Sequence, residues 1–387
     1  MAPRLTIVTS LLPPEQGGPA QQSASLAEFA HQQNVASVVV LVGRQKQWDI
    51  PNAVRVSRCP LSLLPLPGLN YLWVFFYALF HCLVYRPHLI HTQVFGGPGA
   101  VGFVIAGKLL RIPVYSKVSS ERGVDKLMQT NPHVSRRELL RASSWDDWLQ
   151  VKLCYRLLAT THAFQRLLPR KYGISPDRVL YFPNFTTLPL REIEPTINKQ
   201  IDAERRASCG QLLTVARGIR QKNFAACVNA AARLRDMGVP FQWNILGGFN
   251  PSYEKEIRDQ IASANLCQHV ILCGKQPPAV VEDYLSRADI FVMLSQFEWF
   301  GIAVIEAMAS NVPVIVNKVP GMSEIVASPI ARVRAHDPEE VASRIAMLLA
   351  SPDVYRDQIS LANLRVAECY RVEHTGALLV DWLRSKI

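Results

Sequence analysis

The chain has 387 residues, of which 49% are hydrophobic and 19% charged, a balance that argues against a disordered or low-complexity protein. A single core stops growing at roughly 250 to 300 residues, so two domains are expected. The eight cysteines are scattered without a CxxC pair, which gives no zinc-ligand or disulfide pattern and predicts reduced thiols.

The net charge of +11 lies entirely in the first half of the chain. Residues 1–190 hold 20 Lys and Arg against 9 Asp and Glu, whereas the remaining residues hold 22 of each. Such an asymmetry is typical of a domain that meets nucleic acid or an anionic membrane surface, although ordinary solubility charge explains it as well. No recognition-helix, RNP-type or zinc-finger pattern is present, so we expect no nucleic-acid partner.

The first ten residues contain one short apolar run, too short for a signal-peptide core, and no cleavage site follows it. The expected location is therefore cytoplasmic, with peripheral binding at the inner face of the membrane as an open alternative.

Short apolar runs alternate with helix-like stretches in both halves, which is the pattern of right-handed βαβ units. The predicted strands of the first half are residues 5–9, 38–42, 89–92, 114–118 and 179–182, and those of the second half are 212–216, 242–246, 270–273, 290–294 and 314–317. The predicted fold is α/β, with two Rossmann-like domains that face each other across a cleft.

The segment 184–210 is rich in proline, charged and polar residues and is predicted to link the two domains. The expected domains are residues 1–188 and 189–365, and a C-terminal helix at about 366–387 is expected to pack back on the first domain.

Residues 69–85 are nearly all apolar, with Asn70 and His81 as the only clearly polar members. This stretch is slightly shorter than the roughly 20 residues that cross a bilayer. The favoured interpretation is a helix buried against the first sheet. The alternative is a monotopic helix whose aromatic face enters lipid, which the flanking Arg86 and the charge excess support.

A second amphipathic tract, residues 136–171, interleaves basic side chains with leucines and the tryptophans Trp145 and Trp148. It fits a membrane interface or, equally, a core-facing helix with a solvated basic face.

The strongest local motif is a pair of acids, Glu298 and Glu306, directly after the predicted strand 290–294. Gly301 and the helical spacing that follows predict that a helix begins near Phe300 to Ile302, and its free amides would suit phosphate. Glu306 lies on the order of 6 Å along that helix. Its carboxylate can reach a ribose diol, and Glu298 can reach hydroxyls of a sugar.

Two cations, Arg217 and Lys222, surround a glycine-containing loop at the end of the predicted strand 212–216. Cations there can stabilise the charge that develops on a diphosphate leaving group without a metal. In isolation the spacing is more typical of a solvated loop, but Glu298 and Glu306 at a second strand end favour the functional interpretation.

Gly17 and Gly18 follow the first predicted strand and precede a helix-like stretch at 23–32. Most such pairs mark a plain turn, but this position favours backbone contact with a ligand.

Taken together, these residues resemble the retaining glycosyltransferases of group 1, family GT4, which have the two-domain GT-B fold. The resemblance covers nearly the full chain and also rests on Gly247, on Gly274, and on the Pro-Gly at 320–321 with Glu324. It implies a donor domain at 189–365, an acceptor domain at 1–188, and no bound metal or other cofactor beyond a nucleotide-diphosphate sugar, UDP- or GDP-linked, as co-substrate.

The resemblance also implies roles for individual residues. Glu298 would contact the donor sugar and Glu306 the ribose, Phe300, Gly301 and Ile302 would contact sugar or phosphate through the backbone, and Gly274 with Lys275 would lie near the base.

The sequence departs from the family at one position. Many members carry a His-Gly pair after the fourth N-terminal strand, where the histidine touches the donor sugar. This chain instead has Lys117, Ser119 and Glu121 there, which become candidates for the acceptor side. A structural or solvated lysine is the commoner case at a strand end.

The function that the sequence predicts is retaining transfer of a sugar to a hydroxyl of a lipid-linked or polysaccharide precursor at the membrane surface. A nucleotide-sugar epimerase, a sugar phosphorylase, and a non-catalytic membrane-docked partner of another transferase remain alternatives.

Overall fold

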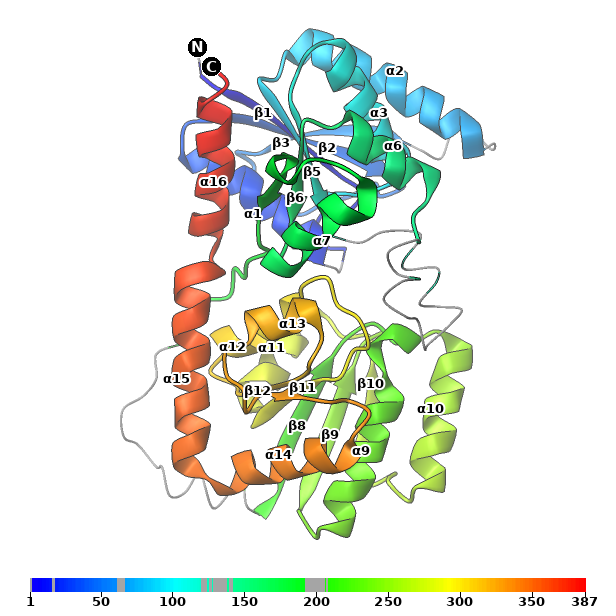
Figure 1. The fold of residues 1–387 in the computed structure, drawn as a ribbon, viewed down its shortest axis with the longest axis vertical. Coiled ribbons are helices and arrows are strands. Elements are labelled where there is room, and N and C mark those ends of the chain that lie inside the picture. The colour runs from blue at the N-terminus through cyan, green and yellow to red at the C-terminus, as the bar shows by residue number, and fades with distance from the viewer. Residues whose placement is uncertain are drawn as a thin grey trace. The chain divides into compact units, whose positions relative to one another are not determined.

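A computed structural model describes residues 2–15, 18–60, 67–119, 142–191 and 208–387, with isolated positions at Val124, Leu127, Glu138 and Arg206. The chain divides into two compact units, Met1–Thr187 together with Tyr370–Ile387, and Leu188–Cys369. Each unit is an open parallel sheet with crossover helices, which confirms the predicted α/β class with two Rossmann-like domains (Figure 1).

The N-terminal unit contains a seven-stranded sheet in the order β3-β2-β1-β4-β5-β6-β7. Its strands are β1 (Arg4–Thr9), β2 (Ala36–Gly43), β3 (Arg55–Pro60), β4 (Leu89–Thr92), β5 (Val114–Val118), β6 (Arg156–Ala159) and β7 (Val179–Tyr181). Its helices are α1 (Gly18–Gln32), α2 (Pro67–Tyr85), α3 (Gly97–Leu109), α6 (Trp145–Leu153), α7 (His162–Tyr172), the short η1 (Pro176–Arg178) and α16 (Val372–Arg384).

All five strands predicted in this half are present, but β3 and β6 were not predicted. Both contain arginine and lack a long apolar run. β3 can do so because it is the edge strand, where Arg55 is exposed. β6 is only four residues long, so the three apolar residues after Arg156 are enough to bury it.

The second unit contains a six-stranded sheet in the order β10-β9-β8-β11-β12-β13. Its strands are β8 (Gly210–Val215), β9 (Phe241–Leu246), β10 (Val270–Gly274), β11 (Ile290–Met293), β12 (Val314–Asn317) and β13 (Arg332–Val333). Its helices are the short η2 (Arg220–Lys222), α9 (Phe224–Asp236), α10 (Pro251–Ser263), α11 (Pro278–Arg287), α12 (Ile302–Ala309), α13 (Pro320–Ile325), α14 (Pro338–Ala350) and α15 (Pro352–Cys369). The five predicted strands are again present, and only the two-residue β13 was missed.

The order in which strands are added to the sheet reverses between β8 and β11, so the helices α9 and α12 that follow these two strands cover opposite faces of the sheet. A buried hydrogen-bond chain joins the strands on either side of this reversal. Trp243 of β9 donates its Nε1–H to Thr214 Oγ1 at 3.0 Å, and that hydroxyl donates to the carbonyl oxygen of Val292 in β11 at 2.7 Å. The loops beyond these strands therefore start from a rigid base.

Helix α16 belongs to the core of the N-terminal unit, although it lies at the far end of the sequence. Leu379 and Leu383 are buried in one cluster with Leu5 of β1. A Cβ atom at Gly376 would lie 2.4 Å from Cδ1 of Phe29, so the glycine lets α16 approach α1 closely.

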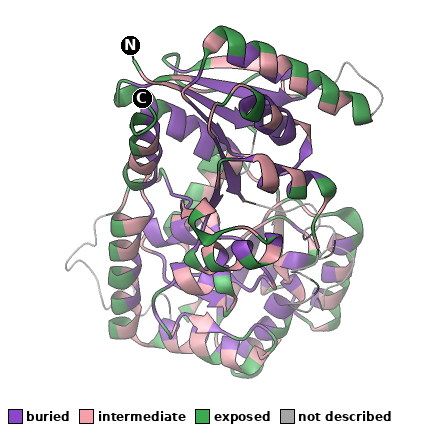
Figure 2. Ribbon diagram, turned by 45° about the horizontal axis from the view of Figure 1, so that its top comes forward, coloured by how far each residue is buried: buried purple, intermediate pink, exposed green. Residues whose placement is uncertain are grey.

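Helix α2 confirms the predicted helix, but the expectation that it is buried is wrong for one of its faces. Val74, Ala78 and Cys82 are buried, and α2 packs against α3 through that face. The opposite face is exposed, as the colouring of α2 in Figure 2 shows. A helix that is apolar on all sides can be covered only on the side where its neighbours pack, and no described residue covers the other side.

Truncation of Leu383 tests the contribution of α16 to the N-terminal unit. Leu383→Ala removes a fully buried side chain and is expected to lower the free energy of unfolding by about 2–5 kcal/mol. The measurement is urea unfolding of the full chain. Leu364→Ala on the exposed side of α15 is the control and should change stability by less than about 0.5 kcal/mol. Equal losses of stability from the two substitutions would contradict the packing of α16 in the core of the N-terminal unit.

Candidate functional site

The loops that follow β8 and β11 are joined by hydrogen bonds. The backbone N–H of Gln296 donates to the carbonyl of Gln221 at 2.9 Å, and the Gln221 side-chain amide donates to the carbonyl of Phe297 at 2.9 Å. The side chain of Asn223 donates to the carbonyl of Leu294 at 3.2 Å. These bonds set the β8 loop directly beside the loop that carries the first acid of the predicted motif.

Lys222 and Glu298, which are 76 positions apart in the sequence, form an ion pair at this junction. Their side chains are only 12% and 13% exposed, so solvent screens the pair much less than it screens a surface ion pair. The structure thus brings together two of the predicted site residues from separate strand ends.

Arg217 lies on the same loop as Lys222 but in a different environment. Its side chain is exposed and makes no hydrogen bond or ion pair with any residue that the structure describes. The neighbouring Arg220, by contrast, is engaged by Glu256, with Nη1 and Oε1 3.0 Å apart. Arg217 is therefore available to an anionic ligand, whereas Arg220 is already neutralised.

The glycines at the ends of the strands allow the loops to approach closely. Gly247 has φ +148°, and a Cβ atom there would lie 1.8 Å from the carbonyl oxygen of Ala216. Its N–H donates to the carbonyl of Gly274 at 2.8 Å, so the ends of β9 and β10 are joined as well. Gly274 has φ +69° with open space around it, and the adjacent Lys275 is exposed.

Helix α12 begins at Ile302, as the sequence predicts, because Gly301 adopts φ +102° and turns the chain into the helix. Phe300 is buried and fixes the preceding loop. Gly321 at the start of α13 is equally constrained, since a Cβ atom there would lie 2.2 Å from the carbonyl oxygen of Glu298. Two glycines thus shape the loop between the two acids.

Glu306 lies in the second turn of α12 and is partly buried, and its carboxyl group makes no hydrogen bond with any described residue. Burial, together with the smaller effect of the negative charge of Glu282 on α11, raises the pKa of its carboxyl group from 4.5 to about 7. The group therefore titrates near neutral pH.

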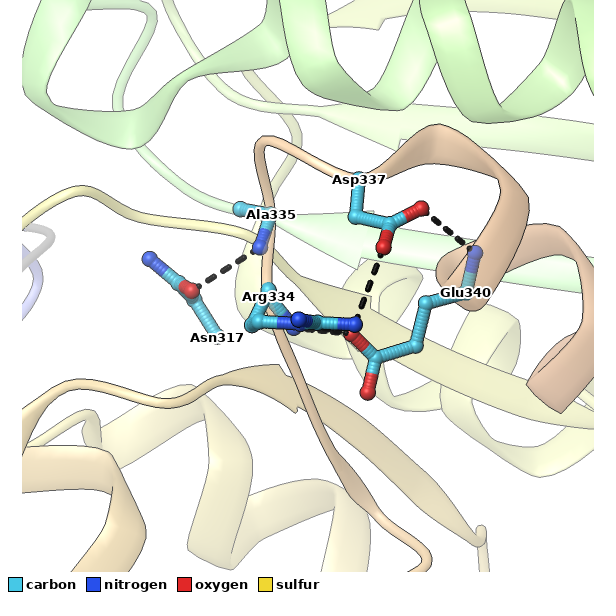
Figure 3. Close-up of polar contacts among 5 residues, drawn as sticks. All are labelled: Asn317, Arg334, Ala335, Asp337 and Glu340. Carbon is cyan, nitrogen blue, oxygen red and sulfur yellow. Dashed lines mark hydrogen bonds and ion pairs between the residues drawn. The ribbon is translucent and has the colours of Figure 1, made fainter.

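Asn317, at the end of β12, is a positioning residue that the sequence did not reveal. Its amide nitrogen donates to the carbonyl of Ser295 in the β11 loop at 2.9 Å. Its Oδ1 accepts from the N–H of Ala335 at 3.0 Å, as Figure 3 shows. Arg334 beside Ala335 is held by Glu340 and Asp337 at 2.7 and 3.0 Å. Asn317 therefore ties the loop that leads to Glu298 to the start of α14. No sequence signal distinguishes an asparagine that bridges two loops in this way from an asparagine in an ordinary turn at a strand end.

The structure describes only some of the candidate residues of the N-terminal unit. Gly18 opens α1, and Ser119 is half-buried with its hydroxyl 3.4 Å from the carbonyl oxygen of Gln93, whereas Gly17 and Glu121 lie outside the described residues.

Lys117 is fully buried in β5, so it is not a solvated lysine. Its Nζ has no hydrogen-bond partner among the described residues and lies 5.0 Å from the ring centroid of Phe182. Burial lowers the pKa of its ammonium group to about 7.

Comparison with known proteins agrees with this architecture. The "Glycosyl transferase 4-like domain" model matches residues 17–184, and the "Glycosyl transferases group 1" model matches residues 202–364. HepE of Anabaena, solved in complex with UDP and glucose, has 16% sequence identity and a TM-score of 0.73, with 99% of each chain covered.

Curated relatives match shorter parts. The amylovoran biosynthesis glycosyltransferase AmsK of Erwinia amylovora is 29% identical over 36% of this chain, and the D-inositol 3-phosphate glycosyltransferase of Paenarthrobacter aurescens is 27% identical over 60% of it. The chain spans 35% and 58% of their respective lengths.

The two parallel sheets with their crossover helices place the protein in the class of two-domain GT-B folds. Within that class, the two adjoining family matches take in most of the chain. The chain belongs to the group 1 glycosyltransferases.

Replacing Glu306 by Gln tests the environment of its carboxyl group. Because the folded-state pKa is about 7 and the usual value is 4.5, the wild type binds an extra proton on folding between these values and loses stability as the pH rises through 7. Glutamine resembles the protonated acid. The melting temperature of Glu306→Gln relative to wild type should therefore be higher at pH 8 than at pH 5, as measured by differential scanning fluorimetry. A difference independent of pH would show that the carboxyl titrates normally.

Proposed function

We propose that this chain is a retaining glycosyltransferase that moves a sugar from a nucleotide-diphosphate sugar, UDP- or GDP-linked, to a hydroxyl acceptor. The observation that carries the proposal is the ion pair between Lys222 and Glu298, because it places a cation and a hydroxyl-binding carboxylate at adjoining strand ends of the second unit. The exposed, unengaged Arg217 on the same loop adds a second cation.

Each of these groups has a task that a diphosphate sugar requires. Arg217 and Lys222 would bind the diphosphate, and the free amides at the start of α12 would add hydrogen bonds to it. Glu298 would accept hydrogen bonds from hydroxyls of the transferred sugar, and Glu306 from the ribose diol. Gly274 and Lys275 at the end of β10 would border the base, and no metal is needed because two cations already face the phosphates.

The proposed chemistry is front-face transfer. The bond between the sugar's anomeric carbon and the diphosphate oxygen breaks while the acceptor oxygen bonds to the same face of that carbon. The acceptor proton passes to a phosphate oxygen of the leaving diphosphate, and Arg217 and Lys222 stabilise the charge that develops there. This sequence of steps retains the anomeric configuration without a protein nucleophile.

The N-terminal unit would bind the acceptor, with Lys117, Ser119 and Glu121 as the candidate residues. We propose a lipid-linked or polysaccharide precursor as the acceptor and a cytoplasmic location at the inner face of the membrane. The basic N-terminal half and the biosynthetic relative AmsK support this choice.

A thermal-shift screen over UDP, GDP, CDP and ADP and their sugars tests the donor class. UDP or GDP and its sugar should raise the melting temperature, since a ligand at 100 times its Kd adds about 2.7 kcal/mol of stability. Incubation of the responding sugar alone, with inorganic phosphate, and with a glycan acceptor then separates the possible reactions. Formation of an epimer from the donor alone would indicate an epimerase, and formation of a sugar 1-phosphate from donor and phosphate would indicate a phosphorylase. Either product, or the absence of any nucleotide response, would contradict the proposal.

Two substitutions test the phosphate site against a matched control on the same loop. Arg217→Ala and Lys222→Ala should each lower kcat on the order of 10²-fold, because each removes charge stabilisation of the leaving group. Arg220→Ala should leave kcat nearly unchanged, since its exposed side chain is held by Glu256 of α10, whereas the nearly buried Lys222 lies at the junction of the two loops. Near-normal turnover by both Arg217→Ala and Lys222→Ala would remove these residues from the mechanism.

A further inference from the structure

The outer face of α2 is a continuous apolar stripe. Its exposed side chains recur at spacings of three and four residues, which places them on one side of the helix: Leu72, Trp73, Phe76, Phe80, Leu83 and Val84. Phe76 and Phe80 are 55% and 66% exposed. Soluble monomers rarely leave so large an apolar surface in water, so the stripe indicates a surface that meets another phase or partner.

The stripe continues onto α6. Trp145 and Trp148 at the start of that helix are 61% and 50% exposed. Trp145 packs against Tyr71 of α2, with ring centroids 4.9 Å apart, and the Tyr71 hydroxyl donates to Asp146 Oδ2 at 2.9 Å. The exposed tryptophans are therefore held rigidly beside the N-terminal end of α2. Tryptophan is the side chain most typical of a membrane–water interface.

The exposed charged residues at the C-terminal ends of α2 and α3 are all positive. Residues 50–120 contain six Lys and Arg and no Asp or Glu. Arg86 follows the last turn of α2, and Lys108 and Arg111 lie at the end of α3. Consecutive crossover helices of a parallel sheet run in the same direction, so these three cations lie at the same end of the helix pair. All three are exposed, and none forms an ion pair with a described residue.

The geometry of α2 points to binding on a membrane rather than crossing it. The window Gly68–Tyr85 has a mean hydropathy of 1.4 and is long enough for a span, with 22% of it buried. However, Val74, Ala78 and Cys82 pack inward, and the helix lies over α3, so lipid can reach one face only. A helix with one lipid-accessible face and flanking cations lies in the interface plane.

We propose that the outer face of α2, extended by Trp145 and Trp148, docks the N-terminal unit onto an anionic lipid leaflet. The apolar stripe enters the acyl boundary, and Arg86, Lys108 and Arg111 contact the headgroups. A second copy of the chain fits this face less well, because the described acids beside the stripe, Asp146 and Asp147, are buried and cannot pair with a partner's cations. The proposal deepens the proposed function by placing the acceptor at the membrane, but lipid binding can be measured without any transfer reaction.

Flotation of the full chain with vesicles tests the proposal. Wild type should float with vesicles of 70% phosphatidylcholine and 30% phosphatidylglycerol, and less with phosphatidylcholine alone or in 0.5 M NaCl. The triple variant Phe76→Ser, Phe80→Ser, Leu83→Ser should lower the partition coefficient roughly tenfold or more, because it removes the apolar contact with lipid. Arg86→Gln with Lys108→Gln and Arg111→Gln should lose the preference for the anionic vesicles, about fivefold for each charge.

The matched control is Leu361→Ser with Leu364→Ser, which removes exposed leucines from α15 and should leave flotation unchanged. Circular dichroism and melting temperature establish that each variant is folded. If the Phe76 triple variant floats like wild type, the proposal is wrong. It is equally wrong if wild type is a dimer by light scattering and the same triple variant makes it monomeric, because the face would then bind a second copy. If the wild-type protein floats with vesicles but binds no nucleotide, the proposed function is wrong and the proposal for the docking face remains supported.

Discussion

The candidate site depends on the point at which strand order reverses between β8 and β11. The loops after these two strands leave the sheet side by side at that point, and backbone bonds through Gln221, Gln296 and Phe297 hold them together. The hydrogen-bond chain from Trp243 through Thr214 to Val292 fixes the strands beneath. Without this base, Lys222 and Glu298 would be two unrelated side chains on mobile loops. With it, their ion pair has a defined position from which a ligand can be oriented.

The charges around this junction are unevenly satisfied, and the imbalance suits an anionic, hydroxyl-rich ligand. Lys222 is paired with Glu298, no described residue engages the Arg217 side chain, and burial brings the pKa of Glu306 to about 7. The Arg217 guanidinium on the β8 loop and the Glu306 carboxyl group on α12 are each poorly compensated by the described residues. In the proposed donor, the diphosphate would pair with Arg217 and the ribose diol would donate hydrogen bonds to Glu306, so one ligand would satisfy both groups.

The N-terminal unit shows a different use of the same architecture. Its sheet is covered by helices whose inner faces form the core, but α2 is apolar on both sides, and described residues pack against only one of them. Lys117 presents the opposite case, a charged side chain inside the sheet whose Nζ has no hydrogen-bond partner among the described residues. Both features cost stability in water, and neither contributes to the core. Such residues indicate surfaces or sites whose partner is absent from the isolated chain.

The sequence alone determined what depends on local patterns. Apolar runs located ten of the strands, and the glycine and helical spacing after Glu298 located the start of α12, because period and backbone freedom are properties of neighbouring residues. Only the tertiary structure revealed the contact between Lys222 and Glu298, the bridging role of Asn317, the burial of Lys117 and the exposed face of α2. Each of these depends on which distant segments pack together, and an apolar helix has the same sequence whether its second face is covered or bare. Strands β3, β6 and β13 were missed for the same reason, since pairing with a neighbouring strand, and not their own composition, makes them strands.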